Sequence, residues 1–68
     1  MINITKLTNK NIGDWVVYCP SYGNAERGKI KSWNNEYIFV VYNCDDKWSN
    51  FQDYTANATN PEYLTLDN

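Results

Sequence analysis

The sequence predicts a small all-β domain. Short runs of β-branched and aromatic residues alternate with Gly, Pro and Asn clusters, which is typical of strands joined by tight turns. The most informative stretch is 27–42, where two such runs flank Asn34-Asn35. Asn adopts positive φ more readily than most residues with a side chain, so this pair predicts a hairpin closed by a type I′ turn. At 68 residues the chain has room for a single core.

The first third of the chain predicts one strand and one loop. Residues 1–11 form either a short edge strand or an ordered N-terminal arm. A Gly-Asp turn then leads into the strand 15–19, which Pro20 ends because proline cannot donate to a ladder. Residues 21–26 are expected to form a loop at one end of the domain.

The two runs of the hairpin differ in pattern. Strict alternation in the first run assigns its side chains to two faces, one with Gly28, Ile30 and Ser32 and the other with Lys29, Lys31 and Trp33. The lysines place the second face in solvent, so Trp33 is expected to be exposed. The second run, Tyr37–Tyr42, is apolar on both faces. Such a strand must be covered on both sides or present a binding surface, and its pattern does not decide which face points inward.

Residues 43–54 form an acidic-aromatic segment. Its three rings, on Trp48, Phe51 and Tyr54, recur at a spacing that one or two helical turns would place on one face. The Asp, Ser and Asn content disfavours a helix, so a long ordered loop is the other interpretation. Residues 55–59 then predict a short strand. Asn60 and Pro61 suit the cap and first position of a single 3₁₀ or α turn before the last strand.

Composition and charge argue against catalysis and against a general phosphate-binding surface. The net charge is −2, and residues 43–68 carry five carboxylates against one lysine. The chain has no His and no Gly-rich phosphate loop, so we expect no enzyme. Two cysteines cannot supply a four-ligand zinc site, and the acidic spacing matches no calcium loop. We therefore expect no metal and no cofactor.

The sequence also predicts a cytoplasmic protein. No basic-plus-apolar leader precedes Ile12, and no apolar run approaches the length of a membrane span. In that compartment Cys19 and Cys44 are expected to be reduced and to act as small buried hydrophobic residues rather than as a redox pair.

Four stretches in this order resemble the small SH3-like barrels of phage and prophage proteins, which are related in shape to KOW and Tudor-like barrels. They are I-G-D-W-V-V-Y (12–18), R-G-K-I (27–30), Y-I-F-V-V-Y (37–42) and A-T-N-P-E-Y-L (58–64). The resemblance covers about residues 12–66 and implies a five-stranded barrel with a short 3₁₀ turn before the last strand. We expect residues 1–68 to form this single domain. It implies little chemistry, and the segment 43–54 departs from the family pattern.

We predict a non-enzymatic module that docks on a host protein and, in doing so, inhibits a host defence or nucleic-acid enzyme. Aromatic anchors rimmed by acids suit a partner with a basic surface. The predicted partner-binding residues are Tyr22, Trp33, Asp45, Asp46, Trp48, Phe51, Asp53 and Tyr54. In an opposing interpretation, Trp48 and Phe51 fold back onto the barrel instead.

Two alternatives stay open. Nucleic acid or a nucleotide would bind a basic face made of Arg27, Lys29 and Lys31 beside Trp33. A structural virion component or oligomer would associate through the doubly apolar strand Tyr37–Tyr42.

Overall fold

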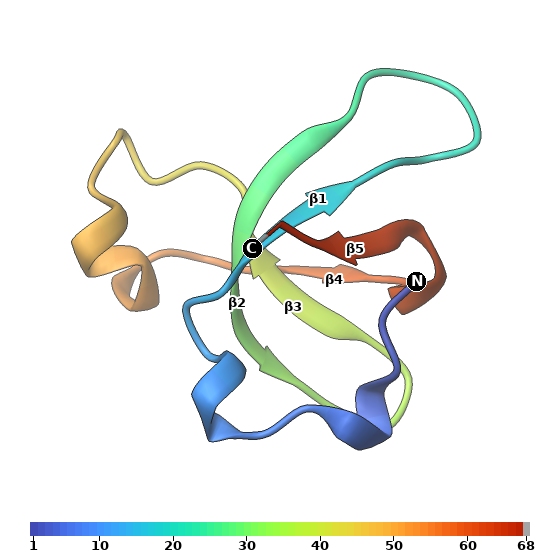
Figure 1. The fold of residues 1–68 in the computed structure, drawn as a ribbon. Coiled ribbons are helices and arrows are strands. Elements are labelled where there is room, and N and C mark those ends of the chain that lie inside the picture. Colours follow the sequence, from blue (N-terminus) through green and yellow to red (C-terminus); the bar gives the residue numbers. More distant parts are fainter. Residues whose placement is uncertain (68) are drawn as a thin grey trace.

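The computed structural model describes residues 1–67 and contains one antiparallel five-stranded sheet, so the all-β prediction is confirmed (Figure 1). The strands follow the order β4-β3-β2-β1-β5, which leaves β4 and β5 as edges and the sheet open. Their bounds are β1 Trp15–Tyr18, β2 Glu26–Trp33, β3 Ile38–Val41, β4 Asn57–Thr59 and β5 Leu64–Leu66. The 3₁₀ turns are η1 Ile4–Lys6, η2 Asn9–Asn11, η3 Trp48–Asp53 and η4 Pro61–Tyr63.

A β-bulge in β2 overturns the predicted face of Trp33. Lys29 and Ile30 pair with Val41 and Val40, but the register then shifts so that Ser32 pairs with Phe39. Lys31 is therefore the extra residue of the bulge, and the alternation changes phase beyond it. Trp33 is turned inward, where it packs against the core, while Ser32 is exposed. The expectation of an exposed Trp33 on the lysine face was wrong.

The hairpin exists, but its turn is not of type I′. Within residues 1–67 the residues other than Gly that have positive φ are Asp45 and Asp46, so Asn34 and Asn35 do not supply left-handed positions. The Asn34 side-chain oxygen instead accepts from the backbone N–H groups of Glu36 and Tyr37, both at 2.8 Å. An Asn that caps its own turn in this way stabilises a different backbone path.

The hydrophobic core lies on one face of the sheet. Its buried members are aliphatic and come from every part of the chain: Ile2, Val16, Ile30, Ile38, Val40 and Leu64. Gly28 is also buried, and it has no room for a side chain. A Cβ at this position would stand 2.6 Å from both Val40 Cγ1 and the Val41 carbonyl oxygen. The close approach of β2 and β3 therefore requires glycine at this position.

The strand β3 is buried on both faces, as one interpretation of its apolar run required. Ile38 and Val40 face the core, and Val41, which points to the other face, is also fully buried. Because β3 lies between β2 and β4, its backbone is paired on both sides as well. The monomer thus covers most of the surface on which association through 37–42 would depend.

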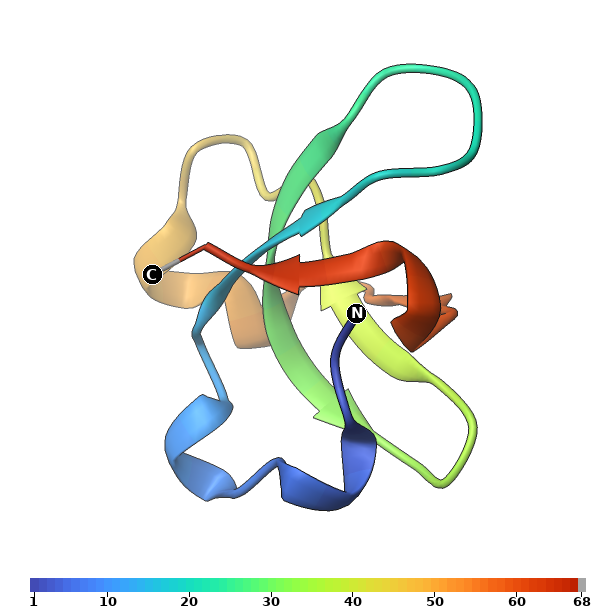
Figure 2. The same cartoon turned by 45° about the vertical axis from the view of Figure 1, so that its right-hand side comes forward.

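The ends of the sheet are occupied by different segments. The loop between β1 and β2 projects at one end, and the N-terminal arm with η1 and η2 closes the opposite end (Figures 1 and 2). The arm is not an edge strand: it buries Ile2, whose N–H donates to the Pro61 carbonyl at 3.1 Å. The turn η4 is capped by Asn60 and begins with Pro61, as predicted. Among residues 1–67 no helix has the length and apolarity to cross a bilayer.

Candidate binding surfaces

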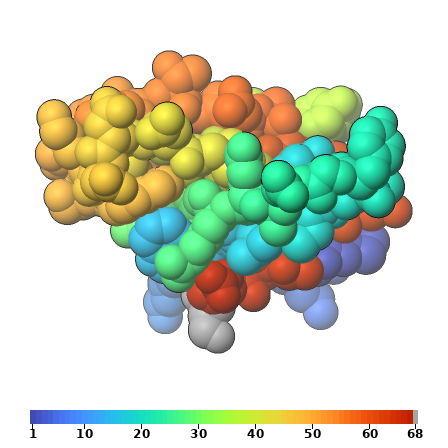
Figure 3. All heavy atoms as spheres, turned by 90° about the horizontal axis from the view of Figure 1, so that it is seen from above, coloured from blue at the N-terminus to red at the C-terminus, as the bar shows by residue number. Residues whose placement is uncertain are grey.

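The structure distributes the predicted partner-binding residues over three places. Tyr22 lies in the β1–β2 loop, whereas Trp33 lies at the far end of the eight-residue strand β2. Trp48, Phe51 and Tyr54 belong to η3 or follow it. In a space-filling view, the segment 43–54 and the β1–β2 loop lie at opposite ends of one face with β2 between them (Figure 3). The predicted residues therefore do not form a single surface.

The first surface is one of which the sequence analysis singled out Tyr22 alone, and we call it the tyrosine groove (Tyr18, Tyr22, Tyr42 and Tyr63). The Tyr18 ring lies 6.1 Å from the Tyr42 ring and 6.3 Å from the Tyr63 ring, between centroids. Tyr22 is 89% exposed beside them. Two adjoining hollows share Tyr18 and Tyr63 as walls: one is completed by Tyr42, Glu26 and residues 57–60, the other by residues 20–22.

Different elements position these rings. Tyr18 ends β1, Tyr63 ends η4, and Tyr42 directly follows β3. The Tyr42 hydroxyl is 2.8 Å from Thr59 Oγ1, which fixes the ring against β4. Because these residues lie far apart in sequence, no local motif predicted the groove. The sequence did predict the turn Pro61–Tyr63, which carries the Tyr63 ring.

The environment of the groove changes the acidity of one of its tyrosines. Burial raises the pKa of Tyr42 above its ordinary value of 10.0, and the nearby Glu26 carboxylate and Tyr18 act in the same direction. The hydrogen bond with Thr59 acts in the opposite direction, but it does not outweigh burial. Tyr42 is therefore a neutral hydroxyl at physiological pH, able to donate a hydrogen bond.

The second surface lies on the outer side of β1 and β2, and we call it the cation-aromatic face (Trp15, Arg27, Lys29, Trp48 and Phe51). The Arg27 guanidinium lies 4.0 Å from the Trp15 ring centroid, and Lys29 Nζ lies 4.9 Å from it. Trp48 packs on the same ring, with centroids 4.7 Å apart and planes tilted by 59°. Phe51 approaches Lys29 Nζ at 5.4 Å.

These contacts favour the interpretation in which the acidic-aromatic segment folds back. Trp48 and Phe51 are both half-buried, and the Phe51 ring stands 3.5 Å from the place where a Cβ of Gly13 would be. Much of the surface of these two rings is therefore in contact with the rest of the protein and is not available to a partner. The exposed side chains that remain on the segment are mainly polar, and Asp45, Asp46 and Asp53 are among them.

The three cations of the predicted basic face also have partners within the fold. Arg27 Nε donates to Asp67 Oδ2 at 2.7 Å, Lys29 lies over the two rings, and Lys31 Nζ donates to the Tyr54 carbonyl at 2.8 Å. The Arg27 and Asp67 side chains are 54% and 44% exposed, so solvent screens that pair. Each partner lowers the positive potential that a phosphate backbone would meet.

The adjacent carboxylates Asp45 and Asp46 form a tight turn. Their φ angles are 53° and 63°, and the Lys47 N–H donates to the Cys44 carbonyl at 2.8 Å. Positive φ at both central residues is the signature of a type I′ turn, so that turn occurs here and not at the Asn pair. Among the described residues, no three His, Cys, Asp or Glu side chains gather as a metal site would require.

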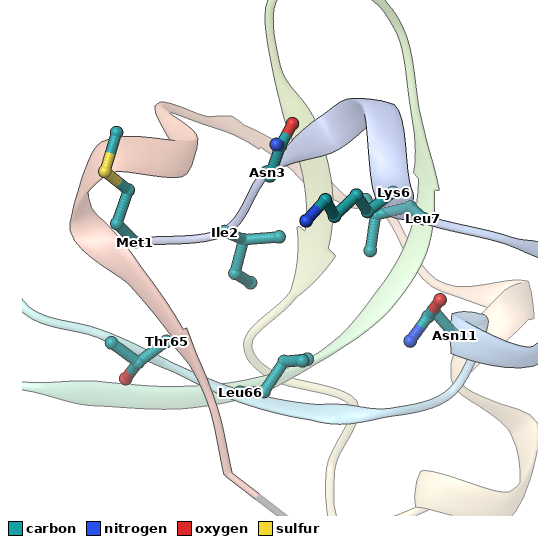
Figure 4. A pocket seen from close by; sticks show the side chains of 8 residues that line it. All are labelled: Met1, Ile2, Asn3, Lys6, Leu7, Asn11, Thr65 and Leu66. Atoms are coloured by element: carbon teal, nitrogen blue, oxygen red, sulfur yellow. The ribbon is translucent and has the colours of Figure 1, made fainter.

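The third surface is a hollow at the N-terminal end of the molecule, lined by the arm and by β5 (Figure 4). The apolar side chains in it come from Met1, Ile2, Leu7 and Leu66. The two cysteines take no part in any of these surfaces as a pair: Cys44 is buried as expected, but Cys19 is exposed. They also lie beyond strands that β2 separates.

Comparison with known proteins finds no family model, no curated protein and no solved structure that matches this chain. The class that the coordinates define is therefore a small antiparallel all-β protein with an aromatic groove at one end.

Proposed function

We propose that this chain is a non-enzymatic protein-binding module with an SH3-like barrel, and that it takes an extended, proline-rich segment of its partner in the tyrosine groove. The strand order and the 3₁₀ turn immediately before β5 support the barrel assignment. The partner in this proposal is a host protein, and the phage or prophage origin remains part of the proposal.

The observation that carries the proposal is the contact of Tyr18 with both Tyr42 and Tyr63 beside an exposed Tyr22. Tilted and edge-on rings leave open furrows between them. A polyproline II segment fills such furrows with its prolines, and it is already extended before binding, so little conformational entropy is lost. Tyr hydroxyls can donate to the carbonyl groups that this conformation leaves unpaired.

The charge of the groove indicates which proline-rich segments fit. Glu26 lines the hollow that Tyr18, Tyr42 and Tyr63 share. A basic residue beside the prolines would meet this carboxylate, which agrees with the basic partner expected from the acidic composition. Because Glu26 is exposed, this contact would set the orientation of the segment more than its affinity.

The test is the affinity of a synthetic peptide with tandem Pro-x-x-Pro motifs and one Arg, measured by titration calorimetry. Tyr22→Ala and Tyr63→Ala each remove an exposed ring, so both variants should fold. Each should weaken binding by about tenfold, since loss of a central aromatic contact costs about 1–2 kcal/mol.

The matched control is Tyr37→Ala, which removes an exposed tyrosine outside the groove. It should leave the affinity unchanged. Equal losses in all three variants, or no saturable binding to the unaltered chain, would refute the proposal. Binding that is retained in the groove variants but lost in Trp48→Ala would return the site to the acidic-aromatic segment.

A further inference from the structure

The hollow at the N-terminal end is built by two segments from opposite ends of the described chain (Figure 4). Its volume is about 320 Å³. Ile2 and Leu7 approach it from the arm, and Leu66 lies across from them on β5. Leu66 is 44% exposed, so the hollow holds apolar surface that the monomer leaves uncovered.

The polar side chains that line this hollow are the Asn3 and Asn11 amides, the Thr65 hydroxyl, which can donate or accept, and the Lys6 ammonium. The Asn3 side-chain oxygen already accepts from the Thr5 backbone N–H and hydroxyl, at 3.1 and 2.7 Å. The Asn11 side-chain oxygen accepts from the Thr8 N–H at 2.9 Å. The Asn3 amide can therefore offer N–H to a ligand, whereas the Asn11 amide nitrogen already donates to Asp14 Oδ2 at 2.9 Å. The charged side chain on the rim is the Lys6 ammonium. A carboxylate, which only accepts hydrogen bonds, complements such a rim.

The backbone of β5 adds a third feature. The Asp67 N–H donates to the Trp15 carbonyl, and the Tyr63 carbonyl accepts from the Cys19 N–H. These two groups, and the backbone of Thr65 between them, therefore point toward β1. By the alternation of an antiparallel ladder, Leu66 directs its N–H and C=O away from β1, on the open edge of the sheet. An extended chain can pair with an edge of this kind.

We propose that this hollow binds the C-terminal residue of a partner polypeptide that ends in an aliphatic side chain. The side chain would contact Ile2, Leu7 and Leu66, the terminal carboxylate would face Lys6, and the partner backbone would pair with the edge at Leu66. Each part of the ligand has a counterpart in the hollow: the side chain has the apolar surface, the carboxylate has the Lys6 ammonium, and the backbone has the open strand edge. This site is independent of the tyrosine groove.

The experiment is fluorescence anisotropy with three short labelled peptides that lack proline and aromatic residues, so that they do not suit the groove. One ends in Leu with a free carboxylate, one is the same peptide as a C-terminal amide, and one ends in Ser. The free acid ending in Leu should bind about tenfold more tightly than either of the others, because each loses one of the two main contacts.

Two lysines of the arm provide a matched pair of variants. Lys6 lines the hollow and Lys10 does not, and both are exposed, so neither replacement threatens the fold. Lys6→Gln should abolish the preference for the acid over the amide, whereas Lys10→Gln should retain it. Leu66→Asn, checked for folding by its thermal transition, should abolish the preference for Leu over Ser.

The proposal is overturned if acid and amide bind equally, if both lysine variants lose the preference equally, or if no peptide shows saturable binding. It is also overturned if octanoate binds at this site while the peptides do not, because the occupant would then be a fatty acid and not a polypeptide end.

Discussion

Gly28 is the single residue on which the packing of β2 against β3 depends most directly. A Cβ at this position would meet Val40 Cγ1 and the Val41 carbonyl oxygen at 2.6 Å and the Tyr42 ring at 3.0 Å. We expect Gly28→Ala to lower the free energy of unfolding by about 2–3 kcal/mol, since two of these atoms belong to well-packed or backbone groups. Urea denaturation measures the change.

The control for Gly28→Ala is Ser32→Ala, on the same strand but exposed. Its unfolding free energy should change by no more than about 0.5 kcal/mol. If the two variants were equally stable, the close approach of the strands in this structure would be incorrect.

Tyr42 should make stability sensitive to high pH. Its pKa is raised above 10.0 in the folded chain, so the fold favours the protonated hydroxyl. That contribution is complete below pH 10.0 and is lost as the pH rises through the higher folded value. Tyr42→Phe should therefore reduce the fall in unfolding free energy above pH 10, measured by urea denaturation at several pH values, while costing about 1 kcal/mol at neutral pH for the lost bond to Thr59.

Tyr22→Phe is the comparison, because Tyr22 is 89% exposed. Its alkaline profile should follow that of the unaltered chain. A Tyr42→Phe profile that also followed it would show that burial of this hydroxyl contributes nothing to the pH dependence.

At the scale of the elements, the turn at Asp45-Asp46 holds two residues in a backbone conformation that residues with a side chain disfavour. Both residues have positive φ, which Gly tolerates and most side chains do not. Asp46→Gly should raise the unfolding free energy slightly, and Asp46→Ala should lower it by about 1 kcal/mol, because alanine removes the same charge without relieving the backbone. Thermal unfolding of the two variants measures this difference. Equal transition temperatures for Asp46→Gly and Asp46→Ala would contradict the positive φ of Asp46.

Element prediction from the sequence succeeded where one local signal determined the outcome. Asn60 followed by Pro61 predicted η4, and the apolar run 37–42 predicted β3, which spans Ile38–Val41. Trp33 was assigned to the wrong face because the bulge at Lys31 is a property of the paired strands and not of the β2 sequence. The type I′ turn was assigned to Asn34-Asn35 on the backbone preference of Asn alone. That preference does not take into account the hydrogen bonds that the Asn34 side chain accepts from the Glu36 and Tyr37 N–H groups.

At the scale of the whole molecule, long-range contacts decide which aromatic residues remain available for binding. The sequence indicated Tyr22 as a partner-binding residue, and this side chain is 89% exposed. It could not show that Trp48 would pack on Trp15, or that Tyr18, Tyr42 and Tyr63 would converge from three elements. Those contacts depend on strand order, which local patterns do not encode.

The same long-range arrangement limits the alternatives. The three cations of the predicted basic face lie against rings, a carbonyl oxygen or the Asp67 carboxylate, and β3 is covered on both faces. The tyrosine groove is the surface on which exposed aromatic area, a hollow and a carboxylate coincide. We therefore propose the tyrosine groove as the binding site.

The most direct test of that claim is a map of backbone amide chemical-shift changes during titration with the proline-rich peptide. We predict that the largest changes fall on the β1–β2 loop, on residues 57–63 and on Tyr42, with little change in the N-terminal arm. Largest changes over Trp48–Asp53 or over 27–31, or no changes at a saturating peptide concentration, would show that the peptide does not bind in the tyrosine groove.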